Sequence, residues 1–224
     1  MPTESDKATR EPLTRFAIAS GALALADREG LDAVTIRRLA NENSVTPMAL
    51  YWHFKDKDAV IDGIAECVFS SIQLPAATSE AWDVQLRAIL EALLEAVSPH
   101  PNVGDLLAPR VMNSQGGLIL ADRVIGLLRS AGFSAAQAAQ TSSLLLCTLI
   151  DLVTSKPADV DDLDDEAVDQ ARRTKQAKLS MLSPRQYPNL LESAQYFVVC
   201  TSDDDYYASG IDFMVNGARG VVRA

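Results

Sequence analysis

The residues best able to do chemistry lie close together between Thr35 and Lys57, in a segment that reads TIRRLANENSVTPMALYWHFKDK. Tyr51, Trp52 and His53 follow one another there, and three such large side chains have no reason to share a solvated surface unless they bind something. A phenol and an imidazole can form hydrogen bonds to phosphates or base edges, while apolar side chains can contact thymine methyl groups. These residue types therefore favour contact with DNA.

Two short helices are expected to position these side chains. Thr35 can cap a helix over residues 36–43 by offering its hydroxyl to the exposed amides of the first turn. After a brief break, Thr46 and Pro47 form a second start signal, because a proline at the first helical position loses no hydrogen bond. This second helix is expected to end near residue 54. Two short helices joined by a tight break are the layout of a helix-turn-helix.

The same pattern gives the segment a buried and an exposed side. Leu39, Ala40 and Val45 are suited to the seam between the two helices, and Leu50 would anchor the second helix from beneath. Met48 then remains exposed beside the aromatic residues, where its apolar side chain could press on a base edge.

Each DNA-facing candidate also has a plain structural interpretation. Tyr51 and Trp52 could belong to the core, as aromatic residues at helical spacing usually do. His53 could be a surface histidine with satisfied hydrogen bonds. Lys57 lies between two aspartates and could simply be a solvent-exposed residue of the polar connection before the next helix. The residue pattern alone leaves these alternatives open.

Charge limits the kind of DNA binding that the chain can perform. The chain has 224 residues, with 20 Lys and Arg against 30 Asp and Glu, and a formal net charge of −10. This balance disfavours an indiscriminate binder of polyanions. Residues 33–57, however, carry a net charge of +2, because they contain Arg37, Arg38, Lys55 and Lys57 against Glu42 and Asp56. We therefore expect one local cationic surface, with Arg37 and Lys57 contacting the flanking backbones.

The rest of the chain is expected to be helical as well. Apolar residues make up 48% of the chain and aromatic residues only 6%, and abundant alanine and leucine favour helices. Apolar residues recur at spacings of three and four between capping residues and glycine or proline breaks. The predicted helices cover about 13–29, 36–43, 47–54, 57–72, 82–97, 103–107, 118–130, 135–153 and 203–222. The predicted fold class is all-α.

Three segments follow from this pattern. Residues 1–12 form a flexible N-terminus, residues 13–73 a three-helix helix-turn-helix domain with a fourth, longer helix, and residues 74–224 a second helical domain. Within the second domain, residues 156–188 contain an acidic run and then a basic stretch. We expect a long mobile connection there, with one exposed helix as an option.

Other classes of function find little support. Cys67, Cys147 and Cys200 are odd in number and far apart, which disfavours a disulfide framework and a zinc site. The two histidines occur without a Ser-His-Asp order or a glycine-rich phosphate loop, so we expect neither an enzyme nor a cofactor. Residues 16–26 imitate a secretory segment, but residues 1–15 have no net charge and no stretch reaches the ~18 apolar residues of a membrane span. We expect a cytoplasmic protein with no membrane association.

The helix-turn-helix segment resembles a known family. LYWHFKDK at residues 50–57, preceded by TIRRLA at residues 35–40, strongly resembles the DNA-binding domain of TetR-type transcriptional regulators, and specifically the tetracycline-repressor branch with its Tyr-Trp-His triplet. The resemblance covers about residues 13–66. A weaker one continues through LAPR at residues 107–110 and LLRSAGFS at residues 127–134, which look like the ligand-binding and dimerisation domain of that branch.

The resemblance implies a homodimer that binds a palindromic operator in double-stranded DNA and is released by a small-molecule effector, which re-angles the fourth helix. It implies DNA contact by Arg37, Thr46, Pro47, Met48, Ala49, Tyr51, Trp52, His53 and Lys57. Thr46 could cap its helix or bond a phosphate. The base-reading positions 47–49 carry no hydrogen-bonding side chain, so readout must depend on Arg37, apolar contact and DNA shape. The operator is therefore expected to differ from that of the tetracycline repressor.

The resemblance also suggests a mainly hydrophobic effector pocket. Positions aligned with drug-contacting residues of the family are Ile89, Leu93, Arg110, Asn113, Val124 and Thr141, although the apolar ones could merely be core. His100 lies ahead of the position that matches the family's metal ligand, where the chain has Leu106 or Leu107. We therefore expect no metal, and a structural or solvated role for His100.

Helices 134–153 and 203–222 are the expected dimer elements. In the second of them, Ile211, Met214, Val215, Ala218 and Val222 mark an apolar face, and Gly210, Gly217 and Gly220 would allow close helix approach. The leading hypothesis is a ligand-responsive repressor. The alternative is a dimeric DNA-binding regulator without a small-molecule inducer.

Overall fold

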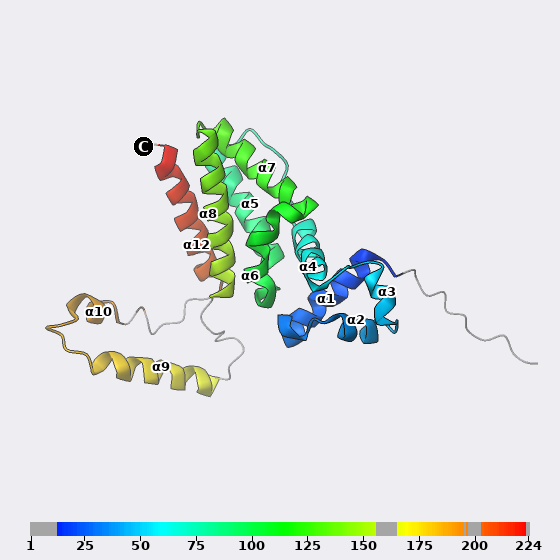
Figure 1. Ribbon diagram of the computed structural model, residues 1–224. Coiled ribbons are helices and arrows are strands. Elements are labelled where there is room, and N and C mark those ends of the chain that lie inside the picture. Colours follow the sequence, from blue (N-terminus) through cyan, green and yellow to red (C-terminus); the bar gives the residue numbers. More distant parts are fainter. Residues whose placement is uncertain (1–12, 156–164, 195, 197–202, 223–224) are drawn as a thin grey trace, which may run out of the picture.

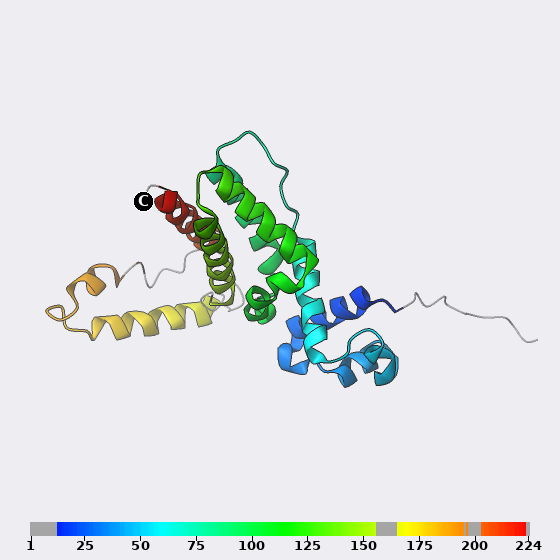
Figure 2. The same ribbon diagram turned by 45° about the horizontal axis from the view of Figure 1, so that its top comes forward.

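The computed structural model describes residues 13–155, 165–194, 196 and 203–222, and all the regular structure in these ranges is helical (Figure 1). This confirms the predicted all-α class. The helices within residues 15–71 form a small group that packs against a larger bundle, which is formed by the helices within residues 82–154 and 203–222 (Figures 1 and 2).

The N-terminal group begins its helices where capping residues stand. Its elements are α1 (Arg15–Glu29), η1 (Leu31–Ala33), α2 (Ile36–Glu42), α3 (Pro47–Tyr51) and α4 (Lys57–Ser71). The side chains of Thr14, Thr35, Thr46 and Asp56 each accept a hydrogen bond from a first-turn amide. Helix α1 ends at Gly30, whose φ of 83° is readily adopted only by glycine. The starts at Thr35, Thr46 and Asp56 were predicted from local sequence, and the structure confirms them, whereas the first helix was expected to begin at about residue 13 without a capping residue.

The larger bundle follows after an extended segment. Its elements are α5 (Trp82–Val97), η2 (Pro101–Val103), α6 (Gly104–Leu107), η3 (Ala108–Asn113), α7 (Gln115–Ser130), α8 (Ala135–Thr154) and α12 (Asp203–Val222). The predicted capping box of α8 is present, with Ser134 and Gln137 bonded to each other's backbone amides. Helix α7 begins three residues before the predicted position because Ser114 caps it.

The predicted connection at 156–188 is only partly described. Residues 156–164 lie outside the described residues, whereas α9 (Asp165–Ser180) fills much of the remainder and α10 (Pro188–Glu192) begins at its end. Both helices project away from the bundle in the two views (Figures 1 and 2). The segment thus contains the exposed helix that was considered as an option.

Helix α12 corrects one expectation. The apolar face expected to form a dimer contact, Ile211, Met214, Val215 and Ala218, is buried inside the subunit, where α12 packs against α5 and α8. The Val222 side chain is outside the described residues. A stripe of apolar residues at helical spacing predicts that a helix will be buried, but it does not say against which partner. Here the partner is the same chain.

Ion pairs fix the polar edge of α12 to α5. Arg87 pairs with Asp212, and Arg219 pairs with Asp83 at 2.6 Å. The hydrogen bond from Arg219 is the main reason that the pKa of Asp83 lies below its ordinary value, because it favours the ionised carboxylate. The outward face of α12 is left with Phe213, Gly217 and Gly220, all exposed.

Helix α8 forms the centre of the bundle. It packs against α5, α6, α7 and α12. Gly104 allows α6 to approach closely, since a Cβ at that position would clash with Thr154. Within the described ranges, α8 alone has the length and hydropathy to cross a membrane, but core helices of globular proteins meet the same criterion.

Candidate DNA-binding surface and ligand cavity

Helix α3 is short and firmly delimited at its start. Thr46 Oγ1 accepts a hydrogen bond from the Ala49 amide at 3.3 Å, and Pro47 occupies the first helical position. The turn before it contains Ser44 in the left-handed region, with φ of 54°, and its backbone bonds back to the end of α2. Leu50 is buried beneath the helix, as predicted.

The opposite side of α3 displays the aromatic cluster. Met48 is 68% exposed, Tyr51 51% and Trp52 86%, while His53 is half-buried. The alternative in which Tyr51 and Trp52 belong to the core of the subunit is therefore wrong. Trp52 is the most exposed of the group. Apolar surface of this size on one short helix indicates a contact with another molecule.

The end of α3 is anchored by a residue that sequence reasoning missed. The chain turns after Tyr51 instead of continuing to residue 54, and this turn buries Phe54 completely. The Arg15 guanidinium lies 4.4 Å from the centre of the Phe54 ring, and its Nη1 donates to the His53 carbonyl at 2.8 Å. Gly63 of α4 makes room for the ring, since a Cβ there would come within about 3.0 Å of it. Arg15 thereby holds the residues that follow α3 against α1.

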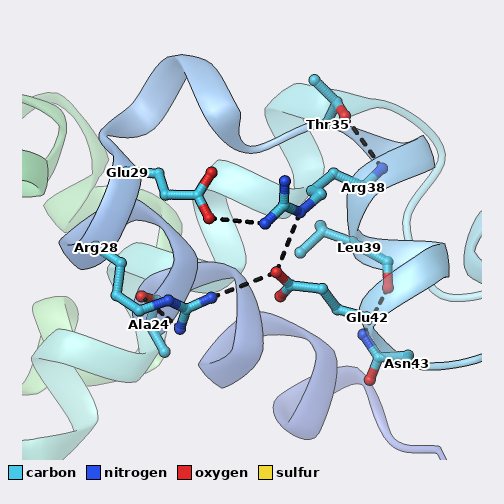
Figure 3. Close-up of polar contacts among 8 residues, drawn as sticks. All are labelled: Ala24, Arg28, Glu29, Thr35, Arg38, Leu39, Glu42 and Asn43. Atoms are coloured by element: carbon cyan, nitrogen blue, oxygen red, sulfur yellow. Dashed lines mark hydrogen bonds and ion pairs between the residues drawn. The ribbon is translucent and has the colours of Figure 1, made fainter.

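The local cationic surface expected between residues 33 and 57 has fewer free positive charges than its residue count suggested. Arg38 binds Glu29 of α1 at 2.7 Å and Glu42 at 3.2 Å, and Arg28 also reaches Glu42 at 3.3 Å (Figure 3). This network joins the C-terminal end of α1 to α2, so Arg38 is occupied within the fold. Its neighbour Arg37 is exposed and has no carboxylate partner within the described part of the chain.

Lysines flank the other end of the aromatic cluster. Lys55 lies 3.9 Å from the Asp56 carboxylate. Lys57, the first residue of α4, is exposed and likewise has no carboxylate partner among the described residues. Arg37 and Lys57 are therefore the candidate residues with charge left to offer to phosphates.

A cavity of about 290 Å³ lies between α5, η3, α7 and α8. Ile89, Leu93 and Val124, all expected near the effector, are part of its wall. The remaining lining is Leu90, Ala108, Val111, Met112, Leu120, Ala121, Ile125, Ala139, Ser142, Ser143, Leu145, Leu146 and Cys147. Two serine hydroxyls and one thiol are the only polar side chains in this wall, which is the character of a site for an apolar molecule.

Three other pocket candidates lie elsewhere. Arg110 points to α4, where it pairs with Asp58 at 2.7 Å and with Asp62 at 3.2 Å, and Asn113 also contacts Asp62. Two carboxylates one helical turn apart offer a guanidinium a better environment than an apolar wall does. Thr141 is buried among the core positions of α8 and does not line the cavity.

These contacts connect the cavity to the helix-turn-helix. Segment η3 presents Ala108, Val111 and Met112 to the cavity and Arg110 to α4. One turn further along α4, Glu66 accepts hydrogen bonds from the Gln115 and Gly116 amides at 2.6 and 3.3 Å. A Cβ at Gly116 would come within about 2.7 Å of the α4 backbone, so α7 and α4 are in direct contact.

His100 lies outside the cavity. Its Nδ1 is 2.8 Å from Asp27 Oδ2, and Asn102 donates to the Ala26 and Asp27 carbonyls at the end of α1. Leu106 and Leu107, one of which was expected at the position of the family's metal ligand, are both buried. No cluster of three or more His, Cys, Asp or Glu within the described residues could hold a metal ion.

Comparison with known proteins accounts for both parts of the chain. The model of bacterial regulatory proteins of the tetR family matches residues 18–64, and that of the tetracyclin repressor-like C-terminal domain matches residues 74–222. The chain is 25% identical over 207 residues to the class C tetracycline repressor protein of Escherichia coli. This match covers 92% of this chain and 90% of the repressor. An HTH-type transcriptional regulator of Saccharopolyspora erythraea is 30% identical over 133 residues, or 59% of this chain, and the match spans about half (56%) of that regulator.

Solved structures agree with these matches. ActR of Streptomyces coelicolor in complex with actinorhodin superposes with a TM-score of 0.80 and 25% identity, covering 95% of this chain and 99% of ActR. The complex of ActR with (S)-DNPA gives a TM-score of 0.79 at 25% identity, covering 94% and 98%. The C-terminal model alone spans more than half of the chain. The chain therefore belongs to the TetR family of bacterial transcriptional regulators, which join a DNA-binding helix-turn-helix to a ligand-binding C-terminal domain.

Proposed function

We propose that the protein is a cytoplasmic repressor that binds a palindromic operator as a homodimer and is released by a small apolar effector. The observation that carries this proposal is the exposure of Met48, Tyr51 and Trp52 on α3, on a chain that also holds an apolar cavity tied to α4. No catalytic step, cofactor or metal is part of the proposal.

Operator reading would rely on few base-specific hydrogen bonds. Pro47, Met48 and Ala49 at the start of α3 offer apolar contact only, and the Thr46 hydroxyl already caps the helix. Tyr51 and His53 supply the polar groups, and Arg37 and Lys57 the phosphate contacts. Specificity would then come largely from the shape of the DNA and from the spacing of two half-sites about 34 Å apart.

A dimer would use the outward faces of α8 and α12. Leu144 on α8 is 67% exposed and Phe213 on α12 is 76% exposed. Gly217 and Gly220 lie on the same side of α12 as Phe213, and a Cβ would meet nothing in the subunit at either position. Small residues beside a large apolar one leave room for a second helix to approach closely, which a partner subunit would supply.

The effector would act through η3. A ligand between α5, α7 and α8 would press against Val111 and Met112, because both belong to the cavity wall. Arg110, the residue next to Val111, would then move its two carboxylate partners on α4. Since Phe54 and Asp56 join α3 to α4 without a flexible linker, a rotation of α4 would change the separation of the two reading helices.

Tyr51→Ala is expected to weaken operator binding by roughly 30-fold or more, because it removes a base or phosphate contact of about 1–3 kcal/mol from each of the two half-sites. The operator would be obtained by selection from random duplexes with the wild-type protein. The melting temperature should be nearly unchanged, since half of the side chain is already in solvent. Tyr187→Ala removes a comparably exposed tyrosine beside α10 and serves as the control. Unfolding of the Tyr51 variant would show that the residue supports the core.

Arg37→Ala and Arg38→Ala form a matched pair of neighbouring substitutions. The first should lower operator affinity and reduce the slope of log affinity against log salt by about 0.9 for each phosphate that the protein no longer neutralises. The second should leave that slope close to wild type but lower the free energy of unfolding by about 1 kcal/mol, because Arg38 pairs with Glu29 and Glu42. Equal salt slopes for the two variants would contradict the assignment.

Phe213→Glu is expected to raise the dissociation constant of the dimer by at least about 10-fold, because an interface side chain of this size is replaced by a charge near its own symmetry mate. Light scattering at micromolar concentration should give twice the 24.1 kDa chain mass for the wild type and a lower mass for the variant. Phe16→Glu, a similarly exposed position on α1, should leave the mass unchanged. A wild-type mass of 24.1 kDa would disprove the dimer.

Val124→Trp is expected to fill the cavity and abolish binding of a neutral apolar dye, phenylnaphthylamine, whose fluorescence rises in apolar sites. Operator affinity should fall as well, because a side chain that fills the cavity would push on η3 in the way proposed for the effector. Val84→Trp on the outer side of α5 adds the same side chain outside the cavity. Unchanged dye binding in the Val124 variant would remove the cavity as the effector site, and the regulator without an inducer would become the better model.

A further inference from the structure

The start of α3 presents an apolar surface at the place where a recognition helix enters the major groove. Helix-turn-helix proteins contact base edges with the first residues of this helix, and here those residues are Pro47, Met48 and Ala49. None of the three carries a hydrogen-bonding side chain. Pro47 and Met48 are exposed, and Ala49 is half-buried. The leading turn of α3 therefore offers a base edge only apolar side chains.

Met48 occupies the outermost position of this turn. Successive residues of an α-helix are rotated by about 100°, so Met48 lies about 160° around α3 from Leu50, which is buried beneath the helix. Trp52, four residues after Met48, continues the helical path and is 86% exposed. Met48 and Trp52 thus share the side of α3 that faces away from the subunit.

Residues that do not face outward fix the position of this turn. The Ala49 amide donates to Thr46 Oγ1 at 3.3 Å and to the Thr46 carbonyl at 3.0 Å. The ring of Pro47 restricts its own backbone to a helical φ, and Leu50 anchors the helix from below. Because the start of α3 is held in this way, it cannot turn another side chain toward the groove, and Met48 is the side chain that meets the base edge.

The base edges of the major groove differ in what they offer to an apolar side chain. Guanine, adenine and cytosine present hydrogen-bonding groups there, whereas thymine adds a methyl group at C5. An apolar side chain that covers a hydrogen-bonding group removes water from it without replacing the lost hydrogen bond, which costs free energy. Contact with a methyl group is favourable instead, because both surfaces leave water. 5-Methylcytosine carries a methyl group at the same position of its ring.

We propose that Met48 reads the C5 methyl group of a pyrimidine in each half-site, so that the operator carries thymine at this position and 5-methylcytosine can replace it. The inference rests on the proposed function, because it assigns a chemical feature to the operator that α3 binds. Methionine suits this contact, since its flexible and polarisable side chain adapts to an irregular surface. Methylation of a cytosine at this position would therefore strengthen operator binding.

The test replaces each thymine of the selected operator in turn by deoxyuridine, symmetrically in both half-sites. Deoxyuridine lacks the methyl group of thymine and keeps all of its hydrogen-bonding groups. At one position the replacement should weaken binding by about 4-fold for each half-site and about 15-fold for both, as expected for one buried methyl group in each. Affinity would be measured by fluorescence anisotropy on the full chain.

A cytosine–guanine pair at the same position gives an independent arm of the test. Cytosine presents a different hydrogen-bonding group from thymine, so the unmethylated pair should bind weakly. Methylation of this cytosine at C5 in both half-sites should restore affinity by about the factor lost with deoxyuridine, because it returns the methyl group alone. Equal affinities for the methylated and unmethylated duplexes would overturn the proposal.

Variants of Met48 distinguish a contact with the methyl group from an effect of that group on DNA shape. Met48→Leu keeps an apolar side chain and should retain most of the deoxyuridine effect. Met48→Gln has a similar length but ends in an amide, and it should bind the thymine and deoxyuridine operators equally. Met181→Gln changes a methionine that is 86% exposed outside the helix-turn-helix and should behave as wild type. Melting temperatures should stay close to wild type, since both positions are exposed.

The remaining outcomes separate methyl reading from operator binding itself. A deoxyuridine effect as large in Met48→Gln as in the wild type would mean that the methyl group acts through DNA shape, and would overturn the proposal. A selected operator in which no deoxyuridine replacement weakens binding would overturn it as well, but would leave the proposed repressor in place. Failure to select any duplex would count against the proposed function and against methyl reading together.

Discussion

The acidic face of α4 is the constraint on which the rest of the structure depends. Asp58, Asp62 and Glu66 stand one turn apart on one side of the helix, and each is bound by η3 or by the start of α7. Trp52, five residues before the first residue of α4, caps the end of the recognition helix, and Phe54 is buried beneath it. Contacts with η3 and α7 in the C-terminal part of the chain, and with Arg15 of α1, together fix the position of the recognition helix. A regulator needs a connection of this kind, because binding at one site must alter the geometry of the other.

Little unpaired positive charge is left on the DNA-binding side of the described structure. Most of the acidic and basic groups near α2 are used to hold α1 against α2, as the pairs of Arg28 and Arg38 show (Figure 3). What remains among the described residues is a pair of flanking cations, Arg37 and Lys57, on a chain of net charge −10. Long-range attraction to DNA is thus weak, and affinity must come from contacts made simultaneously at correct spacing. This favours a regulator with low affinity for non-operator DNA.

The parts that could be predicted from sequence are those stabilised by neighbours in sequence. Helix starts at Thr35, Thr46, Asp56 and Ser134 depend on hydrogen bonds that span three residues, so residue type and spacing are sufficient. The exposed cluster on α3 followed from the same short-range pattern. What could not be predicted depends on contacts distant in sequence. The Arg15 bond to the His53 carbonyl joins residues 38 positions apart, and the Arg110 pair with Asp58 joins residues 52 apart. Periodicity also could not decide whether the buried stripe of α12 meets its own chain or a second one.

In and just after α3, the residues that fix the helix and the residues that are exposed to solvent are different, and this separation bears on how new regulators arise. Thr46, Leu50 and Phe54 hold the helix in place, whereas the side chains of Met48 and Trp52 contribute almost nothing to the packing of the subunit. Under the proposed function, substitutions at the second group would change the operator preference with little loss of the stability on which further mutations depend. After gene duplication, two copies could diverge in DNA preference while sharing one scaffold and one effector. The same separation makes the exposed positions a practical place to engineer mutually independent repressor and operator pairs.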